Sequence, residues 1–324
     1  MEKKGILIYL GIVFGVGWIF WLVGLLTGLF NLLERTFLQD VLFMASIFIP
    51  AVSAEIARAA TGARSSRLPS LAEIRALSLR PVLAILIGIP ILFALPYVVT
   101  TRFGWTEPQW GVGTLVIEVR EVMNSMQARA FSPTFERIMP TFLLVLYPTL
   151  TLLMGVTVLA LLAFGHEWGW RGYLLKQLAP QGECKGKLLA IFLNVVWFVP
   201  LIVYWFISIE KAWDLLHFLP RYFILGLAVG YCLTAIYEAT NKVILSALFL
   251  GVFFSQLQGI WDYLFPIEYM PWTGPFGIVS LVVWIIAAPI FPRLIARWAH
   301  GHEDAGETSA PALDSETATP PSAI

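Results

Sequence analysis

Eight apolar stretches, each long enough to cross the ~30 Å hydrocarbon core of a bilayer, constrain the fold of this chain more than any other feature. Charged residues make up only 13% of the sequence, against about 25% in soluble domains. We therefore expect an all-α integral membrane protein, with about eight transmembrane helices bundled around a central cavity. The stretches are residues 6–30, 38–60, 82–100, 139–164, 188–208, 222–238, 243–262 and 276–297.

Basic residues gather in alternate connections between these stretches, a pattern that fixes the orientation of multi-pass membrane proteins. It predicts that both termini are cytoplasmic, and we interpret the membrane as a prokaryotic plasma membrane. The first stretch follows Lys3 and Lys4 and is too long for a signal-peptide core, so it is predicted to be an uncleaved span. The basic residues are Arg58, Arg64, Arg67, Arg75 and Arg80, then Lys176, Lys185 and Lys187, then Lys242, and finally Arg293 and Arg297.

Residues 1–300 are thus predicted to form one membrane domain with membrane lipid around it. The outward connection 102–138 contains Trp105, Trp110 and a helix-like run, a composition that fits either an interfacial cap or an ordinary solvated loop. Residues 301–324 are rich in Ala, Ser, Thr, Pro and acidic residues, so we expect a disordered cytoplasmic tail. The net charge is zero, which gives no case for nucleic-acid binding.

Gly165 to Leu175, with the sequence G-H-E-W-G-W-R-G-Y-L-L, places several ionisable side chains among the apolar spans. Such a group costs at least ~2.5–3.5 kcal/mol in hydrocarbon, so it persists mainly when it is paired or functional. Helical spacing pairs Glu167 with Arg171. Either this pair joins two spans structurally, or Glu167 or His166 activates a water molecule. Trp170 and Asn194 are predicted to line the same cavity.

The motif resembles the first motif of the CPBP intramembrane proteases, which include the CAAX-processing prenyl proteases and bacteriocin-immunity relatives and in which it reads E-E-x-x-x-R. The likeness covers about residues 40–262, through F-I-P-A at 48–51, W-F-V-P at 197–200 and T-N-K at 240–242. It implies a helical intramembrane endopeptidase, a hydrolase that acts on hydrophobic or prenylated peptides.

The departures from the family pattern fall on its catalytic positions. The family's first glutamate, to which the resemblance assigns water activation, is His166 here, whereas Glu167 and Arg171 match the second glutamate and the arginine. The histidine of the family's second motif is Phe198 here. The histidine of the last motif falls on Leu250 or Gly251, and its asparagine on Phe254 or Ser255.

The distribution of histidine supports the same interpretation. The last four predicted spans contain no histidine, so imidazoles from two further helices cannot complete a catalytic or zinc site there. His217, in a predicted outward loop, echoes H-x-P, but its spacing from Glu167 does not match the family. The chain has four histidines: His166, His217, His300 and His302.

We therefore predict a catalytically degenerate pseudoprotease without a cofactor, which binds a hydrophobic or lipidated peptide or another membrane protein. The alternative is an active CAAX-processing-like endopeptidase with His166 and Glu167 in a rearranged site, and a zinc ion would belong to that alternative. A transporter is a third class, disfavoured because the sequence shows neither an internal repeat nor paired broken helices.

Overall fold

All regular secondary structure is helical in the part of the chain that the computed structural model describes. Seven helices are long and apolar enough to cross a membrane, which confirms the predicted all-α membrane fold. They are Lys3–Gly24, Leu42–Thr61, Leu79–Arg102, Thr134–Gln181, Cys184–Val203, Leu215–Thr240 and Ile278–Trp298. The structure describes residues 2–27, 37–63, 69, 77–125, 132–208, 212–257, 259–265 and 271–300, so the predicted tail at 301–324 lies outside it.

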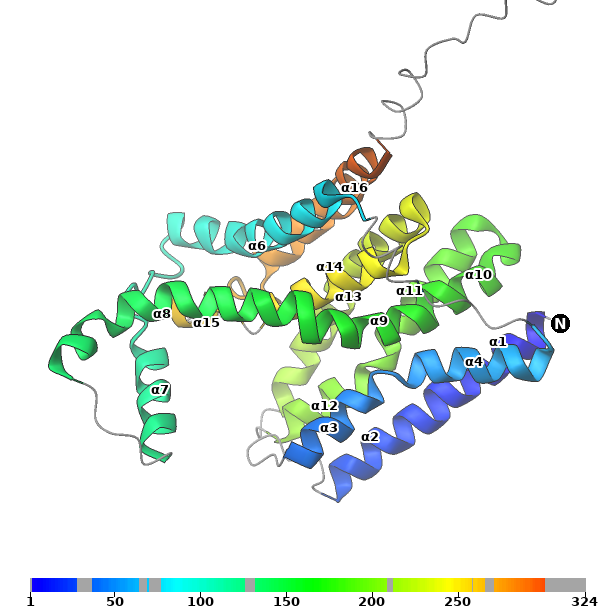
Figure 1. Ribbon diagram of the computed structural model, residues 1–324, viewed down its shortest axis with the longest axis horizontal. Helices are drawn as coiled ribbons and strands as arrows, with labels where there is room; N and C mark the ends of the chain where they lie inside the picture. The colour runs from blue at the N-terminus through cyan, green and yellow to red at the C-terminus, as the bar shows by residue number, and fades with distance from the viewer. Residues whose placement is uncertain are drawn as a thin grey trace, which may run out of the picture.

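The eighth predicted span, residues 243–262, is the short helix α14 (Val243–Leu257). Its 15 residues rise about 22 Å at ~1.5 Å per residue, less than the hydrocarbon thickness. The helix lies at the centre of the bundle in Figure 1 and contacts α6, α8, α9 and α13. Because protein surrounds this helix, its apolar residues mostly pack against other helices.

The longest helix carries the motif. It extends through Thr134–Gln181, 48 residues, whereas hydropathy alone predicts a span that ends at residue 164. The helix begins where Ser132 Oγ accepts a hydrogen bond from the backbone N–H of Phe135 at 3.2 Å, a typical N-cap. Two π-helical turns interrupt it, and such turns are frequent at functional sites. Its parts are α8 (Pro133–Met154), a π turn (Gly155–Leu159), α9 (Ala160–Gly169), a π turn (Trp170–Leu174), α10 (Leu175–Leu178) and a closing 3-10 turn (Ala179–Gln181).

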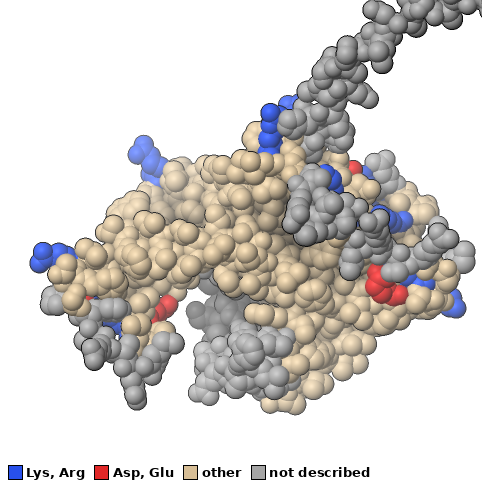
Figure 2. Space-filling model, in the orientation of Figure 1, with Lys and Arg blue, Asp and Glu red and all other residues tan. Residues whose placement is uncertain are grey.

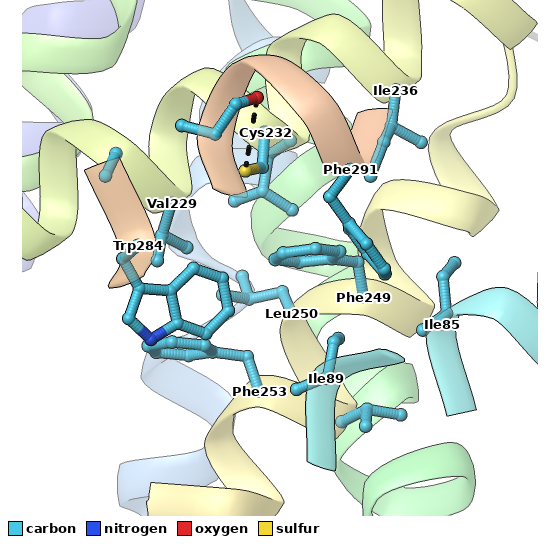
Figure 3. Close-up of a cluster of buried hydrophobic side chains, with 14 of the residues drawn as sticks. Ile85, Ile89, Val229, Cys232, Ile236, Phe249, Leu250, Phe253, Trp284 and Phe291 are labelled. Atoms are coloured by element: carbon cyan, nitrogen blue, oxygen red, sulfur yellow. Dashed lines mark hydrogen bonds between the residues drawn. The ribbon is translucent and has the colours of Figure 1, made fainter. Parts of the chain in front are cut away.

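A large apolar core joins α14 to its neighbours. Figure 3 shows Phe249 and Phe253 of α14 against Trp284 of α16 (Ile278–His300), with Ile85 and Ile89 of α6 (Leu79–Arg102) beside them. The rings of Phe253 and Trp284 meet edge to face, with their centroids 5.2 Å apart. Helix α16 also packs against α13 (Ala212–Thr240), so α6, α13, α14 and α16 form one unit.

The N-terminal span packs against α4 (Ile49–Thr61), which in turn packs on α9. It comprises α1 (Glu2–Leu10), a π turn (Gly11–Val16) and α2 (Gly17–Leu26), and α4 follows α3 (Phe37–Ser46) in the chain. Helix α4 crosses α9 at two glycines. A Cβ atom on Gly165 would collide with the Phe48 ring, and one on Gly169 would collide with the Pro50 backbone. This close crossing brings α4 directly against the motif.

The connection at residues 102–138 contains a helix, α7 (Gly113–Ser125), which packs on α8 and on α15 (Trp261–Leu264). Its Leu115 is buried with Met139 and Leu264. The Tyr263 hydroxyl donates a hydrogen bond to Glu118 Oε2 at 2.7 Å. Partial burial and this hydrogen bond raise the pKa of Tyr263 above its usual value. On the face shown in Figure 2, charged side chains lie mainly toward the edges, as expected for a surface that contacts lipid.

Candidate functional site

The motif side chains lie at the end of α9 and in the π turn that follows it. His166, Glu167 and Arg171 are each at most 2% exposed. Glu167 Oε1 accepts hydrogen bonds from Arg171 Nη1 at 2.9 Å and from His166 Nδ1 at 3.0 Å. The ion pair predicted from the four-residue spacing therefore forms, and the imidazole joins it.

Asn194, from α11 (Glu183–Trp197), closes these contacts into a ring. Its Nδ2 donates to His166 Nε2 at 2.8 Å, and its Oδ1 accepts from Arg171 Nη1 at 3.3 Å. Arg171 Nη2 also donates to the backbone carbonyl of Gly230 on α13, at 3.3 Å. We call His166, Glu167, Arg171 and Asn194 the polar ring. The hydrogen bonds of the polar ring join the motif helix to α11 and α13.

The hydrogen-bond pattern fixes the state of the imidazole. Nε2 accepts from Asn194, so the ring proton is on Nδ1, from which it is donated to Glu167. His166 is thus a neutral side chain with both nitrogens engaged, and the charges of Glu167 and Arg171 balance one another. Glu167 Oε2 is buried without a hydrogen-bond partner.

A cavity of about 330 Å³ borders the polar ring. Its walls come from α3, α9 with the preceding π turn, α11, α12 (Val199–Ser208), α13 and α14. His166, Asn194 and Tyr222 are its polar side chains, and the Tyr222 hydroxyl is engaged with the backbone carbonyl of Val195 at 2.8 Å. The remaining wall is almost wholly apolar, so the polar ring presents only two side chains to a hydrophobic space.

Three of the substituted family positions converge on this cavity. Phe198, Leu250 and Phe254 all line it. The Phe198 ring lies 5.3 Å from the His166 ring and 6.3 Å from the Phe254 ring, between centroids. Where the resemblance assigns histidines and an asparagine, the wall carries two aromatic rings and an aliphatic side chain.

Gly251 and Ser255, the other residues considered for the last motif, are absent from this lining. A Cβ atom on Gly251 would meet the backbone of Ala160 and Gly155, so this face of α14 presses against the long helix. The Ser255 hydroxyl donates to the Val252 carbonyl at 2.7 Å. The geometry therefore favours the register in which Leu250 and Phe254 occupy the family's positions.

Trp170 lies outside the cavity lining, in contrast to the prediction. Its ring packs edge to face on Tyr9, with centroids 5.8 Å apart, and lies 6.3 Å from the Trp197 ring. The N-terminal span covers this part of the long helix, and hydropathy does not reveal which spans are neighbours.

A second polar cluster, not predicted from the sequence, joins α4 to the motif. The Trp168 indole N–H donates to Glu55 Oε1 at 2.9 Å, and Glu55 forms an ion pair with Arg58. Arg58 Nη2 donates to the Gly172 carbonyl at 3.2 Å, and its guanidinium lies 5.0 Å from the Tyr173 ring centroid. The three-residue spacing of Glu55 and Arg58 on a helix is the signal that would have indicated a local pair.

The residues beside the polar ring do not suit a catalytic zinc ion. Such sites use three protein ligands and an open position, whereas the wall next to His166 offers Phe198 and Leu250. Among the described residues, no group of three or more His, Cys, Asp or Glu side chains is arranged to hold a metal ion. His217 is exposed and lies on α13 rather than in the predicted loop. His302 falls outside the described residues.

Comparison with known families confirms the resemblance. Residues 148–253, about a third of the chain, match the family model described as "Rce1-like: Type II CAAX prenyl endopeptidase Rce1-like". This range holds the whole polar ring, Phe198 and Leu250. The chain therefore contains an intramembrane protease-like domain within its multi-pass bundle. No curated protein and no solved structure matches the chain.

Proposed function

We propose that this Rce1-like membrane protein is catalytically degenerate and binds a hydrophobic or lipidated peptide segment in its cavity. The observation that carries the proposal is the convergence of Phe198, Leu250 and Phe254 on the cavity wall beside His166. Carbon side chains there can neither hold a nucleophilic water nor accept a proton from one. The polar groups that remain are bonded mainly to one another.

The polar ring is poorly arranged for hydrolysis. A general base needs a free lone pair within reach of the water it deprotonates, and Nε2 of His166 already accepts from Asn194. A tetrahedral intermediate needs donors directed at its oxyanion. Arg171, the candidate donor, is bonded to Glu167, Asn194 and Gly230. Either step would first have to break a buried ion pair or the ring.

The cavity suits an apolar ligand with one polar point. Its volume of about 330 Å³ lies at the small end of the range for ligand pockets, which are mostly apolar with a few placed polar groups. His166 and Asn194 supply those groups at one side of the wall. A lipid chain or a run of apolar side chains fills the remaining space, with the favourable transfer energy of buried carbon.

Two adjacent leucines provide a matched test of binding. Leu162 lines the cavity, whereas Leu161 is 63% exposed on the outside of the same helix. With a fluorescent prenylated peptide and protein in lipid nanodiscs, Leu162→Trp should weaken binding at least tenfold by filling the cavity. Leu161→Trp should bind like the unaltered protein. Equal affinity for all three proteins would place the ligand elsewhere and defeat the proposal.

The second candidate is an active endopeptidase that uses His166 and Glu167. It is favoured by one observation, the unpartnered Oε2 of Glu167 next to an imidazole that borders the cavity. Its test is a pH–rate profile of peptide cleavage in proteoliposomes, with and without His166→Gln. A limb of the profile that disappears with the imidazole supports this candidate, and the absence of cleavage at every pH counts against it.

A further inference from the structure

Four polar atoms on buried side chains of the N-terminal span and the motif helix have no hydrogen-bond partner: Glu167 Oε2, the hydroxyls of Tyr9 and Tyr173, and the indole N–H of Trp170. All four side chains are at most 3% exposed, and none of them lines the apolar cavity. Tyr9 contacts two of the other three side chains. Its ring packs edge to face on the Trp170 ring and lies 5.2 Å from the Tyr173 ring, between centroids, and the charge of Glu167 acts on its hydroxyl.

Burying these polar atoms without any hydrogen-bond partner would lower the stability of the fold. Each buried donor or acceptor without a partner costs about 1–3 kcal/mol, and native proteins rarely leave them unpaired. Internal water commonly resolves the problem, since one molecule makes about three hydrogen bonds to such groups.

The chemistry of the four atoms selects the ligand. The indole N–H of Trp170 can only donate, the ionised carboxylate of Glu167 can only accept, and the two phenols can do either. A water molecule can accept from Trp170 and donate to Glu167 at the same time. The carboxylate repels an anion, and the indole N–H together with the nearby Arg171 disfavours a metal cation.

We propose that this group binds ordered water that bridges Glu167 Oε2 to Tyr9 and Trp170. Further polar side chains lead from Tyr173 toward the surface. Tyr173 lies beside Arg58, and Glu55, the ion-pair partner of Arg58, has a side chain that is 38% exposed. We therefore place the route by which water reaches the buried carboxylate on the α4 side. The N-terminal span, which lies outside the residues that match the family model, supplies part of the site. The inference does not depend on whether the protein cleaves a peptide.

The variant Tyr9→Phe tests the bridge because it removes one oxygen atom and keeps the ring. If the hydroxyl binds water, the loss lowers the thermal midpoint by about 2–4 °C. If the hydroxyl is dry and unpaired, its removal relieves a burial cost, and an unchanged or higher midpoint would overturn the proposal. Tyr222→Phe is the matched control, because its hydroxyl already has a carbonyl acceptor, and its shift sets the scale.

A density map of the unaltered protein, at a resolution that shows ordered water, decides the question independently of stability. We expect a solvent peak within hydrogen-bond distance of both Tyr9 Oη and Glu167 Oε2. Clear density for both side chains with no peak between them would overturn the proposal. Neither result depends on peptide binding or cleavage, so failure of the water site and failure of the proposed function are separable.

Discussion

Replacing Glu167 by alanine should lower the stability of the fold, and this loss of stability should be its main effect. Glu167 and Arg171 are almost completely buried, and Glu167 Oε1 is the acceptor for both Arg171 and His166. Removing one partner of a buried ion pair costs about 3–5 kcal/mol. Arg171 keeps its bonds to Asn194 and Gly230, so we expect the lower end, about 3 kcal/mol. At about 2–4 °C per kcal/mol, the thermal midpoint falls by roughly 6–12 °C.

A double-mutant cycle separates the ion pair from general damage. Glu167→Ala and Arg171→Met each leave one buried charge unpaired, whereas the double variant removes both. Thermal unfolding of the four proteins in mild detergent, followed by circular dichroism, measures the coupling. The double variant should be at least ~1 kcal/mol more stable than the sum of the single losses predicts. Strict additivity, or a Glu167→Ala midpoint within about 1 °C of the unaltered protein, would refute the reasoning.

Two further predictions concern the frame around the ion pair. Gly169→Ala should destabilise the protein by about 1–3 kcal/mol in a thermal-unfolding measurement, because the added methyl collides with the Pro50 backbone. Gly172→Ala is its control and should be neutral or stabilising, since the nearest atom to the new Cβ is 3.6 Å away. Asn194→Leu should cost about 1–3 kcal/mol in the same assay, because His166 Nε2 loses its donor and Arg171 an acceptor. In a protein that already carries His166→Leu, Asn194→Leu should cost markedly less stability. Equal losses with and without His166→Leu would contradict the hydrogen bonding of the polar ring.

Hydropathy predicts most of this fold because the membrane imposes one requirement on every span. Seven of the eight predicted spans meet the length and composition of a crossing helix. The exception is α14, which is apolar because protein surrounds it. Hydropathy does not distinguish a helix buried in protein from one that crosses lipid. Similarly, hydropathy ends the fourth span at residue 164, since it does not follow the helix into the polar motif.

The sequence also predicts one part of the candidate site and misses another. The four-residue spacing predicts the pairing of Glu167 with Arg171, and the position of Asn194 one turn before Phe198 places it at the cavity. The contacts of Tyr9 and Glu55 with the motif depend on which helices are neighbours, so a single sequence carries no direct signal for them. Trp170 shows the limit most plainly, because its face of the helix meets the N-terminal span instead of the cavity.

Cleavage of a prenylated peptide in proteoliposomes, compared between the unaltered protein and Glu167→Gln, tests the central claim most directly. The glutamine variant keeps the side-chain shape and an acceptor for Arg171, so its folded fraction can be matched by thermal unfolding before the assay. We predict that the unaltered protein binds the peptide and releases no more product than the variant or empty liposomes. Sustained turnover by the unaltered protein that disappears in folded Glu167→Gln would contradict the degenerate-protease account.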